Sequence, residues 1–121
     1  MMGTTPILKP SILIDMRKNR IRIHKNTLRA LGDPDFVVLI INPEEHTLGI
    51  KCSVLDDKLA HRIHKNTTKN DCELYSKPLM AALHELCPEW DGRERYKIEG
   101  GIIEEENMAV FSMRDGTMLG H

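Results

Sequence analysis

Basic side chains gather near the start of the sequence with no acidic residue among them. Residues 16–32 contain no Asp or Glu and carry six basic residues: Arg17, Lys18, Arg20, Arg22, Lys25 and Arg29. Guanidinium and ammonium groups on a turn and a neighbouring helix can contact phosphates, and Arg also forms bidentate hydrogen bonds with guanine. This cluster predicts a contact with duplex DNA.

Acidic side chains gather later in the chain, so the two charge types are segregated. Residues 89–106 hold seven acidic residues against three basic ones, although the formal net charge of the chain is −1 and its pI is about 6.6. A weaker basic set, Arg62 and Lys65 beside His61 and His64, adds to the predicted DNA-binding residues. The competing interpretation is a solvated basic face that the acidic half neutralises within the molecule or its oligomer.

The remaining residues that could do chemistry do not form a recognisable site. His61 and His64 are three apart on an expected strand and point to opposite faces, while His84 and Cys87 share a helix face but lack a second pair of zinc ligands. GxSxG, HExxH, P-loop and GxGxxG motifs are absent from the sequence. We therefore expect no enzyme activity, no cofactor and no metal site.

Length and composition predict one folded domain over residues 1–121, with flexible ends at 1–10 and 114–121. The hydrophobic fraction is 40%, and no apolar run approaches the roughly 18 residues that span a bilayer. No secretory signal is recognisable, and the three cysteines form no CxxC pair, which is typical of reduced thiols. These features predict a cytoplasmic protein without membrane contact.

Hydrophobic patterns predict the elements that position the basic residues. Strands are expected over 11–17 and 20–24, joined by a two-residue turn at Lys18–Asn19, and a short helix is expected over 27–31. Residues 36–41 predict a strand buried on both faces, and 48–52 predict its hairpin partner. The fold class is therefore mainly β with short helices.

The second half repeats this order of elements. Strands are expected over 61–65, 72–76, 95–98 and 108–113, with a helix over 77–88 and a turn at Gly100–Gly101 followed by an acidic loop. Residues 36–52 match 96–112 at a constant spacing of 60 positions. The order predicts two tandem β-β-α-β-β units, 11–52 and 60–113.

The hexapeptide RIHKNT occurs twice, at 22–27 and 62–67. The copies are 40 positions apart and so fall out of register with the longer repeat. We expect the first copy to end a strand and start a helix, and the second to form a first strand and enter a turn.

The segments RKNRIRIHKNTLRALG and DPDFVVLIINPEEHTLGIKC resemble the AbrB/MraZ/SpoVT swapped-hairpin superfamily. Two such units in one chain are similar to the MraZ arrangement, and the resemblance implies interlocked hairpins that form one β-barrel-like pseudo-dimer. It also implies that the first turn and the short helix contact DNA, which carries over to the six basic residues of 16–32.

Two functions follow from these features as expectations. The first is a non-enzymatic DNA-binding transcriptional regulator of AbrB/MraZ-like type that acts as a homo-oligomer. The alternative is a phage- or mobile-element-encoded protein or small-ligand binder, or an inhibitor of a host system, that uses the same scaffold and its acidic half without binding DNA.

Overall fold

The computed structural model describes residues 9–54, 56–65 and 71–119. The first half contains two hairpins with a helix between them: β1 (Ser11–Asp15), β2 (Arg20–His24), α1 (Lys25–Ala30), β3 (Phe36–Asn42) and β4 (Thr47–Ser53). The second half contains β5 (His61–Arg62), β6 (His64–Lys65), β7 (Asp71–Tyr75), α2 (Lys77–Leu86), β8 (Arg95–Ile103), β9 (Met108–Ser112) and β10 (Thr117–Met118), with 3-10 turns η1 (Glu104–Glu106) and η2 (Met113–Asp115).

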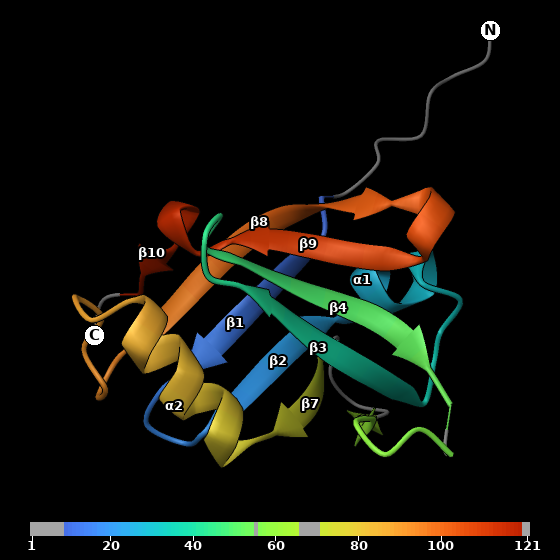
Figure 1. The fold of residues 1–121 in the computed structure, drawn as a ribbon, viewed down its shortest axis with the longest axis horizontal. Coiled ribbons are helices and arrows are strands. Elements are labelled where there is room, and N and C mark those ends of the chain that lie inside the picture. Colours follow the sequence, from blue (N-terminus) through green and yellow to red (C-terminus); the bar gives the residue numbers. More distant parts are fainter. Residues whose placement is uncertain (1–8, 55, 66–70, 120–121) are drawn as a thin grey trace, which may run out of the picture.

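The strands form one nearly closed, barrel-like sheet in the order β5-β3-β4-β9-β8-β1-β2-β7-β6, with β10 added beside β8. The ends of this order, β5 and β6, flank the single residue Ile63 in the chain. Figure 1 shows β3, β4 and β9 crossing in front of β1 and β2, with α1 and α2 at opposite ends. The predicted class, mainly β with two short helices, is confirmed.

Strands from the two halves alternate around the sheet in pairs. The β3–β4 hairpin lies between β5 and β9, and the β1–β2 hairpin lies between β8 and β7. Every neighbouring pair is antiparallel. Each half therefore completes the hydrogen bonding of the other half's strand edges.

Alternation of side chains along these strands fills the interior. Ile12 pairs with Ile23 and Ile14 pairs with Ile21, and all four isoleucine side chains are buried. Burial of each is worth about 1.5–3 kcal/mol relative to exposure in water. The opposite side chains of the same strands, among them Arg20 and Arg22, consequently point outward from the barrel.

Local sequence explains where both helices begin. The His24 ring Nδ1 accepts a hydrogen bond from the Asn26 backbone N–H at 3.1 Å and so caps α1 two residues earlier than an Asn26 cap would. Ser76 caps α2 by accepting from the Leu79 N–H at 3.2 Å, with Pro78 in the first turn. Leu79, Met80 and Leu83 of α2 are buried against the sheet.

Four predictions about individual strands and turns need correction. The β1–β2 connection is four residues long, 16–19, although Asn19 does take a positive φ of 52°. Strand β3 is not buried on both faces, because only Val37 among its seven residues is fully buried, and an antiparallel sheet keeps one face in solvent. Gly100–Gly101 is not a turn but the middle of β8, where Gly100 lies against β9. The tail expected to be flexible instead contains η2 and β10, which pairs with β8.

The two hairpins β3–β4 and β8–β9 correspond at a spacing one residue longer than the predicted 60. Their connections, 43–46 and 104–107, each end in a left-handed residue, His46 and Asn107, with φ of 56° and 50°. With the turns aligned, Ile50 corresponds to Phe111, and both are fully buried.

The two RIHKNT copies adopt different structures in their described parts. Residues 22–24 end β2 and Lys25 begins α1, whereas His64 and Lys65 form β6. Residues 66 and 67, where the second copy was expected to enter a turn, lie outside the described residues.

Candidate nucleic-acid interface

The structure places five of the eight predicted DNA-binding residues at the two ends of the β1–β2 hairpin. Arg17, Lys18 and Arg20 lie at the turn, which contacts the start of α2 through a hydrogen bond from the Ser76 N–H to the Asn19 carbonyl. Lys25 and Arg29 lie on α1, at the other end (Figure 1). A strand of five residues separates the two groups by about 13 Å.

At the turn, the basic side chains surround a buried carboxylate. Asp15 is fully buried and accepts hydrogen bonds from the Arg17 backbone N–H at 3.1 Å and from the Arg17 guanidinium at 3.3 and 3.4 Å. Arg20 Nη2 lies 3.6 Å from the same carboxylate. Burial by itself raises the pKa of Asp15, but the hydrogen bonds and charge of Arg17, with the charge of Arg20, outweigh it and hold this pKa below its ordinary value.

A second carboxylate, that of Glu73 on β7, forms ion pairs with the arginines of β2. Arg22 is paired with Glu73 in the β2–β7 register, and its Nε lies 3.4 Å from Glu73 Oε1. Arg20 Nη1 lies 3.4 Å from the same oxygen, and the Tyr75 hydroxyl donates to Glu73 Oε2 at 2.7 Å. Arg20 and Arg22 therefore form ion pairs between strands. This arrangement agrees with the competing interpretation of the charge pattern, in which acidic residues of the second half neutralise the basic face within the molecule.

The two predicted DNA-binding residues of the second half, Arg62 and Lys65, also contact other side chains of the protein. The Arg62 guanidinium lies over the Phe36 ring at 5.0 Å from its centroid. Lys65 Nζ donates to Asp35 at 2.8 Å and lies 3.6 Å from Asp33. The hydrogen bond to Asp35 raises the pKa of Lys65, and the same bond lowers the pKa of Asp35.

Three of the predicted residues keep their charge available to solvent. Among residues 9–54, 56–65 and 71–119, no carboxylate lies within ion-pair distance of Lys18, Lys25 or Arg29. Arg29 Nη1 donates instead to the Asn26 side-chain oxygen at 3.5 Å. Lys25 and Arg29 lie together on α1, so this helix carries two of these three open positive charges.

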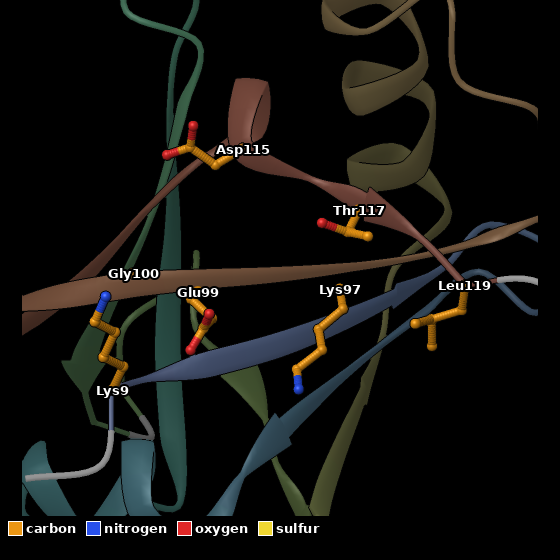
Figure 2. Close-up of a pocket in the computed structure, with 7 residues that line it drawn as sticks. All are labelled: Lys9, Lys97, Glu99, Gly100, Asp115, Thr117 and Leu119. Atoms are coloured by element: carbon orange, nitrogen blue, oxygen red, sulfur yellow. The ribbon is translucent and has the colours of Figure 1, made fainter.

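A polar groove lies beside α1 on the outer face of β8. It has a volume of about 520 Å³ and is lined by Lys9, Lys97, Glu99, Gly100, Asp115, Thr117 and Leu119. Figure 2 shows that these side chains come from three segments: the residue pair before β1, strand β8, and the η2–β10 tail. An adjoining hollow shares Lys9, Lys97 and Glu99 with this groove and extends to His24 and Asn26 at the start of α1.

The groove and the adjoining hollow therefore extend from two lysines that the sequence patterns did not single out, Lys9 and Lys97, to Asn26, the hydrogen-bond partner of Arg29 on α1. The chain places Lys9 and Lys97 88 positions apart, and pairing of β1 with β8 brings their segments together. Lys97 alternates with the buried Tyr96 and Ile98, so its outward orientation could have been predicted, but its position beside β1 could not. From Lys97 through Lys9 and Asn26 to Arg29, the surface is one band of polar groups in which the cations outnumber the carboxylates of Glu99 and Asp115.

Other candidate chemistry is weaker in the part of the chain that the structure describes. No group of three or more His, Cys, Asp or Glu side chains there could hold a metal ion. Cys52, Cys72 and Cys87 form no disulfide in the described structure, and burial, with a smaller effect of Glu89, raises the pKa of Cys87 to about 11. No described helix has the length and apolar content to cross a membrane.

Comparisons with protein-family models, with curated proteins and with solved structures found no match to this chain. The geometry of the fold and of the band beside α1 therefore carries the functional argument.

Proposed function

We propose that the protein is a non-enzymatic DNA-binding regulator of the AbrB/MraZ-like swapped-hairpin type, which docks α1 and the adjacent groove on duplex DNA. The observation that carries the proposal is the pair Lys25 and Arg29, which lack a carboxylate partner among the described residues; Arg29 hydrogen-bonds Asn26, which lines the same hollow as Lys9 and Lys97. The alternation of hairpins from the two halves supports the swapped-hairpin type.

The same contacts narrow the predicted interface. Arg17, Arg20, Arg22 and Lys65 already contact carboxylates, so moving them to phosphate would sacrifice interactions within the protein. No such carboxylate contact among the described residues would be lost if phosphate were bound by Lys25, Arg29, Lys9 and Lys97. We therefore assign phosphate contacts to these four residues and a structural role to Arg20 and Arg22.

The proposal includes a homo-oligomer on DNA. Helix α2, which occupies the place of α1 in the second half, carries Lys77 and His84 but no pair of cations like Lys25 and Arg29. One chain thus presents one strong DNA-contacting helix, and a site with two half-sites needs two chains.

Salt-dependent affinity for duplex DNA tests this proposal. Four phosphate contacts predict that log K falls by about 3 to 4 for each unit rise in log salt concentration, because each contact releases counterions. Fluorescence anisotropy with a labelled random-sequence duplex measures the slope. Lack of binding at low salt, or binding without steep salt dependence, would refute DNA binding.

A matched pair of charge reversals tests the assignment of the interface. The double variant Lys25→Glu/Arg29→Glu should lose at least tenfold in affinity, whereas Lys58→Glu/Lys77→Glu, which makes the same charge change at exposed positions elsewhere, should lose much less. Equal losses in the two variants would show that net charge, and not α1, determines binding. Circular dichroism checks that both variants are folded.

A small-ligand binder is the second candidate, and one observation favours it. The groove brings the ammonium groups of Lys9 and Lys97 together with the carboxylates of Glu99 and Asp115, and no ion pair joins them in the described structure. Such a lining recognises a ligand that carries both charges, such as an amino acid or the end of a peptide. Calorimetric titration with free amino acids distinguishes it from the DNA-binding proposal.

A further inference from the structure

The outer face of β3, β4 and β9 is largely apolar but also carries the exposed Lys51, which the register places between Val38 and Met108; the outer face of β1, β2 and β7 is charged. Ile40 is 44% exposed and Ile103, at the end of β8, is 36% exposed, with Val38, Met108 and Val110 partly exposed between them. These strands lie side by side on the near side of the molecule in Figure 1. The inward side chains of the same strands already fill the core, so these outward ones are not needed there.

The centre of this face is hollowed. A depression of about 200 Å³ is lined mainly by Ile40, Ile103, Met108 and Val110, with Gly49 in its floor. The register places Gly49 directly between Ile40 and Val110, and a Cβ there would lie 2.9 Å from the Met108 sulfur. The Met108 side chain therefore covers Gly49, and Met108 and Ile40 together form the apolar lining of the depression at this position.

Exposed glutamates stand at both ends of the same face. Glu44 and Glu45 form the β3–β4 turn, and η1 (Glu104–Glu106) forms the β8–β9 turn. Because β4 and β9 are antiparallel neighbours, these turns lie at opposite ends of the face. None of the five carboxylates makes an ion pair with the described residues.

The charge of the two ends decides what can cover the apolar centre. A second copy packed face to face with its strands nearly aligned would bring glutamate turns against glutamate turns. A cationic segment with apolar residues at its centre gains attraction at both ends and fills the depression between them. We propose that the outer face of β3, β4 and β9 is a docking surface for a basic amphipathic segment of another protein.

This inference does not depend on DNA binding. The surface comprises Ile40, Ile103, Met108 and Val110 with the two glutamate turns, and it includes neither α1 nor the groove residues. Charge reversal on α1 should therefore leave docking unchanged, so failure of either proposal can be recognised separately.

The test uses the full chain and a labelled synthetic peptide of Lys and Leu at amphipathic helical spacing. We expect saturable binding, and at least a tenfold rise in Kd for the variant Ile40→Ser/Ile103→Ser. The control Leu59→Ser/Met118→Ser removes two apolar side chains that are at least as exposed, away from the depression, and should bind as the wild type does. Absence of saturable binding, or an equal loss in the control, would overturn the proposal.

Charge dependence and self-association complete the test. Glu44→Gln/Glu45→Gln should weaken the Lys–Leu peptide several-fold, and a peptide with Glu in place of Lys should not bind. If both peptides bound equally, the glutamate turns would have no selective role and the proposal would fail. It would also fail if sedimentation showed a dimer that Ile40→Ser/Ile103→Ser converts to monomers, because the occupant would then be a second copy.

Discussion

Asp15→Asn should destabilise the protein strongly although it changes only the charge of one side chain. The carboxylate is fully buried, accepts three hydrogen bonds from Arg17 and faces Arg20, whose side chain is 12% exposed. The amide removes one of the two carboxylates that contact the Arg20 guanidinium in the described structure, leaving Glu73, and turns an NH₂ group toward cations. Because Arg17 is half exposed, we discount its share and expect a loss of about 2–3 kcal/mol.

The measurement is urea and thermal unfolding followed by circular dichroism. For a domain of 121 residues, each kcal/mol shifts Tm by about 4 °C, so Asp15→Asn should melt about 8–12 °C below the wild type at pH 7. Asp56→Asn makes the same chemical change at an exposed carboxylate and should shift Tm by less than about 2 °C.

The difference between wild type and Asp15→Asn should depend on pH. The folded state lowers the pKa of Asp15 below its ordinary value of 3.8, so the contribution of the charge is fully present above that value and is lost as pH falls through the folded pKa. The gap should be constant above about pH 5 and shrink below pH 4. A gap under 0.5 kcal/mol at pH 7, or one that persists unchanged at pH 2, would refute this account of the hairpin turn.

Three further perturbations test the packing and the thiols. Gly100→Ala should destabilise the protein by at least about 2 kcal/mol, since the new Cβ would lie 2.2 Å from the Val110 carbonyl oxygen, whereas Gly101→Ala meets nothing within 4 Å and should be tolerated in the same unfolding assay. His24→Ala should cost about 1 kcal/mol through loss of the α1 cap, and His24→Asn, which restores an acceptor, should recover most of it in thermal melts. In native protein an iodoacetamide time course should label Cys52 well before Cys87, whose pKa is about 11; the reverse order would contradict the burial described.

Local patterns predicted the elements whose signals lie within a few residues. The alternation RIRIH predicts β2, and Pro78 with the spacing of Leu79, Leu83 and Leu86 predicts α2. Gly100–Gly101 misled the prediction because glycine is typical both of turns and of places where two backbones approach closely, and local sequence does not separate these uses.

The candidate site was only partly predictable because its partners are distant in sequence. The basic cluster is visible in 16–32, but Glu73 neutralises Arg20 and Arg22 only through the β2–β7 pairing. Lys97 likewise comes beside Lys9 only through the β1–β8 pairing. Charge counts along the chain therefore overestimated the free positive surface at the turn and missed half of the band beside α1.

The alternation of hairpins around the sheet has a consequence for folding kinetics. In the first half alone, β1 and β2 would lack β8 and β7, and β3 and β4 would lack β5 and β9, so both hairpins would expose unpaired edges. The sheet closes only after contacts form between residues as distant as Ser11 and Glu99, which makes folding slow compared with a helical protein of this size. A nascent chain ending near Ser53 would therefore be prone to aggregation until the second half emerges from the ribosome.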